Sequence, residues 1–242
     1  MKTAIENIWT MAAGEAVECP RGVEGLRQRL VAMGAIAQEL TSQALQALVQ
    51  RDRELAFCVN ERDRTLDYCR VEIDRLVVQE LSKGLSTEEL RLVPVIMKIS
   101  HELEAIGNAA SRIARQSSAL CDGPPLKAAV AVPRMAILSL NMLNAALKAF
   151  NECDSSVALE VIPQDKEIDA WNLIVRQKLI EQMVSKPERT KCCLRWMAIS
   201  HSLGRIGDHV ANIAEDVILV CDGRNANPVE LKGAARSLAI NN

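Results

Sequence analysis

The chain has 242 residues, of which 49% are hydrophobic and only 2% aromatic. This apolar content is sufficient for a buried core and excludes a disordered chain, while the low aromatic content favours helices packed closely on helices. The formal net charge of -2 provides no basic surface for nucleic acid, so no nucleic-acid partner is expected.

The N-terminus does not have the pattern of a signal peptide, because Lys2 and Glu6 interrupt it and no long apolar run follows. The most apolar later segment, 134–148, is too short to span a bilayer and contains Asn141 and Asn144. We therefore expect a soluble, cytoplasmic protein without direct membrane insertion.

The eight cysteines include no CxxC pair, which argues against a zinc ribbon. Adjacent Cys192 and Cys193 would point to different helix faces and are poor disulfide partners. We expect the cysteines to be reduced and mostly small core residues, with Cys121 and Cys221 at helix ends rather than acting as ligands.

The chain contains an internal duplication. ISHELEAIGNAASRIARQSSALCDG (99–123) and ISHSLGRIGDHVANIAEDVILVCDG (199–223) share most of their apolar frame at an offset of 100 residues. Residues 31–67 align with 132–169 at an offset of 102. This spacing indicates a duplicated domain rather than a short solenoid repeat.

The apolar residues recur at helical spacing, which predicts an all-α fold of six long helices in two tandem, pseudo-symmetric three-helix bundles. The predicted helices lie near 23–50, 53–82, 87–121, 126–152, 155–184 and 187–221. The predicted parts are an N-terminal extension (1–20), a first repeat (21–123), a second repeat (124–223) and a polar C-terminal tail (224–242).

Local signals support these helix boundaries. Ser86 with Glu89, and Ser185 with Glu188, have the spacing of a capping box that would open the third helix of each repeat. The CDG sequences at 121–123 and 221–223 would end those helices. Pro94 and Pro133 lie inside predicted helices, and each should either kink its helix or mark a later start of that helix.

Each repeat carries acidic residues on its second and third helices. The second helices contain aspartates four residues apart, which places both carboxylates of a pair on one face: Asp63 with Asp67, and Asp165 with Asp169. The third helices offer His101, Glu104 and Asn108 in the first repeat, and His201, Gly204 and Asp208 in the second.

These residues allow two interpretations. Oxygen ligands from facing helices can hold a cation, and the ligand types suit Mg, Mn, Fe or Ca, with Zn if a histidine joins. Alternatively, the acidic pairs are simply solvated, and His101 and His201 are half-buried histidines satisfied by packing. The presence of the same pair in both repeats favours the cation more than one pair alone would.

One segment resembles a known family signature. SLGRIGDHVANIAED (202–216) is similar to the third-helix signature of the PhoU family, and ELEAIGNAASRIA (102–114) resembles it more loosely. DRTLD (63–67) and DKEID (165–169) resemble the family's acidic second-helix motif. The resemblance extends from about residue 20 to residue 222.

The resemblance implies a cytoplasmic six-helix protein, often a homodimer, that acts in phosphate homeostasis. Family members couple the ATPase subunit of the phosphate ABC transporter to a sensor histidine kinase. They repress phosphate uptake and the phosphate-starvation response when phosphate is plentiful. The resemblance thus implies these two partners for this chain.

The family's metal-binding acidic motifs carry over residue by residue. The resemblance implies ligands at Asp63, Asp67, Glu104 and Asn108 in the first repeat, and at Asp165, Asp169 and Asp208 in the second. Asn108 and Gly204 depart from the family's usual acids, so each repeat keeps three of four carboxylates. Glu102 lies at another acidic family position, and its counterpart is Ser202.

A non-enzymatic regulatory adaptor is the leading functional hypothesis. The sequence shows no nucleophile with a base partner, no phosphate-cradling glycine loop and no fingerprint of an organic cofactor. One alternative is a metal-dependent or metal-storage bundle that uses the same carboxylates with Fe, Zn, Mg or Mn. Another is a regulatory domain of the kind attached to ion transporters, which here would act on a separate chain.

Overall fold

The computed structural model describes residues 22–62, 64–121, 126 and 131–222, and contains no strand within them. The predicted extension and tail (1–20 and 224–242) and the glycines of both CDG sequences lie outside these residues. The helices of the first repeat are α2 (Val23–Gln50), α3 (Arg53–Glu61), α4 (Arg64–Leu81) and α5 (Thr87–Leu120). Those of the second are α6 (Val132–Glu152), α7 (Ser155–Val161), α8 (Gln164–Ser185), the 3-10 turn η2 (Pro187–Arg189) and α9 (Thr190–Cys221).

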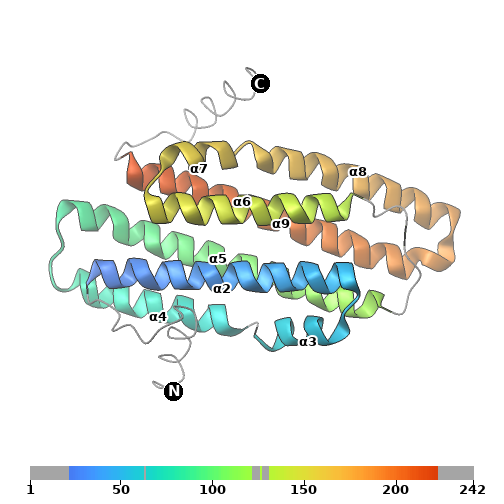
Figure 1. Ribbon diagram of the computed structural model, residues 1–242, viewed down its shortest axis with the longest axis horizontal. Coiled ribbons are helices and arrows are strands. Elements are labelled where there is room, and N and C mark those ends of the chain that lie inside the picture. Colours follow the sequence, from blue (N-terminus) through green and yellow to red (C-terminus); the bar gives the residue numbers. More distant parts are fainter. Residues whose placement is uncertain (1–21, 63, 122–125, 127–130, 223–242) are drawn as a thin grey trace.

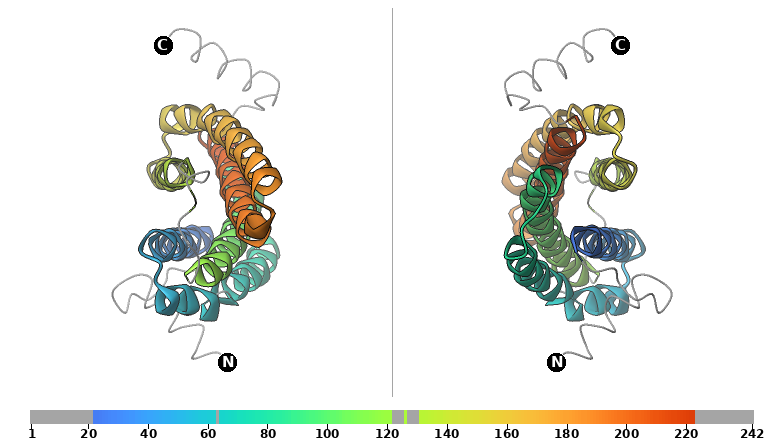
Figure 2. Two further views of the ribbon diagram at one scale, coloured as in Figure 1. Left: turned by 90° about the vertical axis from the view of Figure 1, so that its right-hand side faces the viewer. Right: turned by 90° about the vertical axis from the view of Figure 1, so that its left-hand side faces the viewer.

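The two repeats form two three-helix bundles that lie one above the other, with their helices along the long axis of the molecule (Figure 1). Within each bundle, the third helix packs against both of the others. The bundles meet mainly where α5 lies beside α9, and also where α2 lies beside α6, as the end-on views show (Figure 2). This arrangement confirms the predicted all-α fold of two tandem bundles.

The duplication is visible in the core, because corresponding positions are buried in both repeats. At an offset of 102, buried Leu66 and Ile73 on α4 correspond to buried Ile168 and Val175 on α8. At an offset of 100, the buried α5 residues Ile99, Leu103, Ile106 and Ile113 correspond to Ile199, Leu203, Ile206 and Ile213 on α9. The offsets in the sequence therefore give the packing register.

The predicted second helix of each repeat is broken into two pieces. In the second repeat the break falls at Pro163, which lacks the N–H that a continuous helix would use. The first repeat breaks at the corresponding point, around Arg62, without a proline. The aligned aspartates Asp52 and Asp154 cap the short first pieces by accepting backbone N–H bonds.

The other boundary predictions had mixed outcomes. The Ser86–Glu89 capping box is present, and Pro133 lies in the first turn of α6, which therefore starts late. Pro94 lies inside α5. The capping box at Ser185 is wrong, because Pro187 holds the preceding residue in a non-helical conformation and a 3-10 turn opens α9 instead.

The prediction that all cysteines are reduced is wrong for two of them. Cys153 and Cys221 form a disulfide that joins the end of α6 to the end of α9, with their Cα atoms 5.5 Å apart. They are 68 residues apart in the sequence, so only the fold brings them together. Cys69 and Cys193 are buried as predicted, whereas Cys58 is exposed.

In the described part of the chain, every helix falls short of the length and apolarity required to cross a bilayer.

Candidate functional site: the acidic faces of the two repeats

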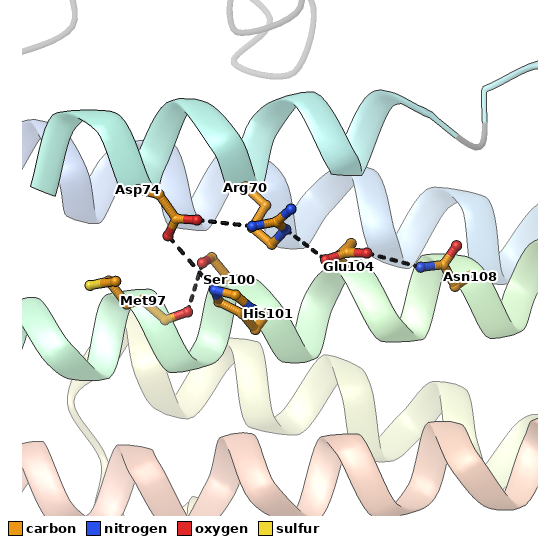
Figure 3. Close-up of polar contacts among 7 residues, drawn as sticks. All are labelled: Arg70, Asp74, Met97, Ser100, His101, Glu104 and Asn108. Atoms are coloured by element: carbon orange, nitrogen blue, oxygen red, sulfur yellow. Dashed lines mark hydrogen bonds and ion pairs between the residues drawn. The ribbon is translucent and has the colours of Figure 1, made fainter.

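In the first repeat, the acidic face is organised around an arginine. Arg70 on α4 places Nε 2.7 Å from Oε2 of Glu104 on α5, and its Nη1 donates to Oδ2 of Asp74 at 2.9 Å (Figure 3). The side-chain amide of Asn108 donates to the other oxygen of Glu104 at 3.1 Å. Both carboxylate oxygens of Glu104 therefore already have a protein partner.

The other predicted metal ligands of the first repeat are Asp63, Asp67 and, as a possible addition, His101. Asp67 lies half-buried in the first turn of α4, and Asp63 lies outside the described residues. His101 is exposed, with Nε2 3.7 Å from Oδ1 of Asp74. His201 is exposed as well, so the interpretation of the two histidines as half-buried packing residues is wrong.

In the second repeat, three predicted carboxylates come into electrostatic contact. Asp165 lies near the start of α8, over α9 at Gly207, where an added Cβ would lie 2.7 Å from Oδ1 of Asp165. Its neighbours Asp208 and Asp169 are exposed, whereas Asp165 is half-buried. Its Oδ1 is buried and has no hydrogen-bond partner among the described residues.

This environment raises the pKa of Asp165 to about 6. Burial is the largest cause, because a charged carboxylate loses hydration there, and repulsion from Asp208 and then Asp169 adds to it. Asp208 on α9 and Asp169 on α8 thus repel Asp165 without a compensating cation among the causes of this shift. In the first repeat, by contrast, Arg70 lies between Asp74 and Glu104.

The acidic faces differ at several corresponding positions, among them the two that form the Arg70–Glu104 ion pair in the first repeat. Arg70 and Glu104 correspond by the repeat offsets to Asn172 and Gly204. Asn172 accepts a hydrogen bond from Ser200 at 2.6 Å, and its amide nitrogen would lie 3.2 Å from a Cβ at position 204. A glutamate at that position would therefore crowd this asparagine.

The predicted ligands do not form a preassembled metal centre in the described ranges. No three histidine, cysteine, aspartate or glutamate side chains among residues 22–62, 64–121, 126 and 131–222 are grouped so as to hold a metal ion. The second-repeat aspartates nevertheless fit a cation chemically, since Asp165 has a buried oxygen without a hydrogen-bond partner and is repelled by Asp208 and Asp169.

A second polar cluster lies between the repeats, and sequence reasoning identified only part of it. Glu102 on α5 is 2.6 Å from Nδ1 of His209 on α9, and Asn212 donates to its other oxygen at 3.3 Å. Lys98 on α5 forms an ion pair with Asp216 on α9 at 3.1 Å. Burial raises the pKa of Asp216, while Lys98 opposes this rise.

The fold and its acidic faces define a class of protein: a duplicated three-helix bundle with charged residues between its second and third helices. A family model described as the PhoU domain matches residues 30–117 and 132–217, one match in each repeat. The chain belongs to the PhoU family, as the third-helix motif indicated.

Individual relatives are similar over most of their length. The phosphate-specific transport system accessory protein PhoU homolog of Pseudomonas putida is 33% identical, covering 87% of this chain and 83% of that protein. The PhoU protein of Escherichia coli strain K12 is 30% identical, covering 84% and 85%.

Solved structures agree with the fold. The crystal structure of PhoU from Pseudomonas aeruginosa has a TM-score of 0.80 and 33% identity, and the match covers 83% of this chain and 97% of that one. The phosphate transport system regulatory protein PhoU from Streptococcus pneumoniae has a TM-score of 0.78 and 25% identity, with 85% and 97% covered.

Proposed function

We propose that this protein is a cytoplasmic, non-enzymatic regulator of phosphate homeostasis. The match of both repeats to the PhoU domain is the observation that carries the proposal, together with relatives named as accessory proteins of the phosphate-specific transport system. In this proposal the protein couples the ATPase subunit of the phosphate ABC transporter to a sensor histidine kinase. It thereby represses phosphate uptake and the starvation response when phosphate is plentiful.

An exposed apolar surface on the second helices supports a role in binding other proteins. On α8, Leu173, Ile180 and Val184 lie on one side of the helix and are 69%, 39% and 78% exposed. The α4 counterparts of the first two, Val71 and Val78, are 54% and 66% exposed. Solvent-facing apolar residues at corresponding positions are more typical of a docking surface than of isolated chance exposure.

The charge of a groove between α5 and α9 argues against phosphate itself as its ligand. The groove, of about 650 Å³, carries three acidic side chains but only Lys98 as a permanent cation. Its acidic residues are Glu102, Glu215 and Asp216. An anion would meet net repulsion there, which favours regulation through protein partners.

Gene deletion in the source organism tests the proposed function. Deletion should derepress phosphate-starvation genes in high phosphate, and the wild-type gene should restore repression. The double substitution Leu173→Ser with Val184→Ser should restore it less well and recover less transporter ATPase and kinase in a pull-down. The matched control is Val49→Ser on α2, another exposed residue. Normal phosphate-responsive expression after deletion, with no second copy of the gene, would exclude the proposal.

A second candidate function is cation binding at the second repeat. The observation in its favour is the buried, unpartnered oxygen of Asp165 beside Asp208 and Asp169. In this candidate function a cation such as Mg, Mn, Fe or Zn binds at Asp165 and supplies the positive charge that this face lacks, although Asp208 and Asp169 are not grouped with Asp165 as a preassembled site in the described residues. A bound cation would also stabilise the α8–α9 contact.

Elemental analysis of chain purified without chelator tests this second function. The wild type should retain a cation, and Asp165→Asn with Asp208→Asn should lose it. Glu181→Gln, which removes an exposed carboxylate further along α8, is the control and should leave the metal content unchanged. Equal metal content in all three proteins would contradict the assignment.

A further inference from the structure

The first repeat has a cation of its own at the place where its acidic face would take a metal ion. Figure 3 shows the guanidinium of Arg70 between Asp74 and Glu104, reaching from α4 across to α5. Asn108 completes the set by donating to Glu104. The charge of Glu104 is paired by Arg70 and its Oε1 accepts a hydrogen bond from Asn108, whereas Nε of Arg70 and Oδ1 of Asp74 have no hydrogen-bond partner among the described residues.

Partial burial makes this ion pair stronger than an ordinary surface pair. The side chains of Arg70, Glu104 and Asp74 are 26%, 25% and 28% exposed, so water screens their attraction only in part. One guanidinium also bridges two carboxylates, a geometry that arginine supports better than lysine. Displacement of Arg70 by a metal ion would leave its charge half-buried and without these partners.

The second repeat shows what happens when the arginine is absent. Arg70, Asp74 and Glu104 correspond to Asn172, Arg176 and Gly204, so all three members of the cluster are replaced. The corresponding apolar positions around them remain buried, as Leu66 and Ile73 in the first repeat and Ile168 and Val175 in the second. The glutamate is therefore present in the repeat that has the arginine and absent from the repeat that lacks it.

We infer that Arg70 is the resident cation of the first repeat and that it excludes divalent metal ions from Glu104 and its neighbours. The two repeats thus handle the same acidic face in different ways. The first places a guanidinium between two of its acids, Asp74 and Glu104. The second leaves a buried carboxylate oxygen uncompensated.

The test replaces Arg70 with the residue that occupies its position in the second repeat. Full-length chains carrying Asp165→Asn and Asp208→Asn, which removes the second-repeat carboxylates, are titrated with Mn²⁺ and followed by electron paramagnetic resonance. Adding Arg70→Asn should create binding of about one further Mn²⁺ per chain, because carboxylate and amide oxygens suit this ion. Adding Glu104→Gln to that variant should abolish the gain, and Arg70→Lys should produce none.

Two results would overturn the inference. The first is Mn²⁺ binding by the Arg70-containing chain that Glu104→Gln abolishes, since the arginine would then not exclude the metal. The second is no added binding in an Arg70→Asn chain that keeps its helical circular dichroism spectrum. Neither outcome depends on phosphate regulation or on metal in the second repeat, so the proposals fail independently.

A thermal unfolding cycle in EDTA gives a second readout. Arg70→Asn and Glu104→Gln should each lower Tm, and the double variant should lose less than the sum of the two losses. Strict additivity would show that the two side chains do not compensate each other and would also contradict the inference.

Discussion

At the scale of single residues, two partly buried carboxylates, those of Glu104 and Asp165, lie in different electrostatic environments. Glu104 shares a guanidinium with Asp74, whereas Asp165 has a buried oxygen without a partner and a raised pKa. The first arrangement places the acid in an ion pair, and in the second burial and repulsion favour the protonated acid. The two acids should therefore respond oppositely to neutralisation by mutation.

Asp165→Asn should stabilise the protein at neutral pH. The folded-state pKa of about 6 lies above the reference value of 3.8, so the folded state binds a proton more tightly than the unfolded state. The stability contributed by this group is present below about pH 4 and is lost as pH rises through 6. Because Asp165 is only half-buried, we expect a gain of about 1 kcal/mol at pH 7 and almost none at pH 4.

Urea unfolding at both pH values in EDTA measures this difference. Asp169→Asn, which removes an exposed carboxylate one turn further along α8, is the control and should give a smaller gain. An equal effect of Asp165→Asn at pH 4 and pH 7 would show that the mutation acts on packing rather than on charge.

The sequence pattern predicted which helix faces are acidic, but not which side chains pair with the acids. The spacing of Asp165 and Asp169, and of Glu104 and Asn108, was enough to place each pair on one helix face. Arg70 was missed because its partner lies on another helix and its counterpart Asn172 is uncharged, so the duplication gave no signal. The pairing of Glu102 with His209 depends on how the two bundles cross, which no local pattern encodes.

At the scale of helices, glycines set how closely the second and third helices of each repeat approach. A methyl group at Gly107 of α5 would overlap Cδ1 of the fully buried Leu66 on α4. The corresponding Gly207 lies against Asp165 and Ile168 of α8. The G in the shared IG of both repeats is therefore a packing requirement rather than a helix-breaking signal.

Gly107→Ala should destabilise the protein by about 1–2 kcal/mol, because the cost of overpacking exceeds the gain in helix propensity. Gly204→Ala is the matched control, since its added Cβ would meet only the amide nitrogen of Asn172 at 3.2 Å. It should be close to neutral. Chemical denaturation of the two variants measures the contrast, and equal stabilities would contradict the packing argument.

Helix boundaries show where sequence signals suffice and where they fail. Ser86 caps α5 as predicted because its partner Glu89 is local. The same pattern at Ser185 fails because Pro187 intervenes and imposes its own backbone geometry. Pro163 predicts the break in the second helix of the second repeat, because proline disrupts a helix interior. The corresponding break near Arg62 has no proline and could not be predicted in this way.

At the scale of the whole molecule, the two repeats are joined by more than their connection. Ion pairs and hydrogen bonds link α5 of the first repeat to α9 of the second. Within the second repeat, the disulfide ties the last turn of α9 back to the end of α6. Residues Ala109–Ser111 of α5 are consecutively buried, which means that this helix is covered on several sides.

Cys153→Ser should lower the free energy of unfolding by about 2–4 kcal/mol under non-reducing conditions, since the disulfide constrains the unfolded chain. Cys121→Ser, at the corresponding end of the first repeat, is the control, because that thiol is not in a disulfide and lies 3.3 Å from the backbone carbonyls of Arg51 and Ser117, to which it can donate. A reducing agent should lower the Tm of the wild type but not of Cys153→Ser. The same response in both would show that the disulfide does not contribute.

The side-by-side packing of α5 and α9 has an evolutionary consequence. A gene that encoded one repeat, as it stood before duplication, would have produced a bundle whose third helix was uncovered along one side. Two such chains could cover that side only by pairing with each other, in the way that α5 now pairs with α9. In the single chain this pairing does not depend on protein concentration, and the two halves are no longer equivalent: the first carries Arg70 and the second the Cys153–Cys221 disulfide.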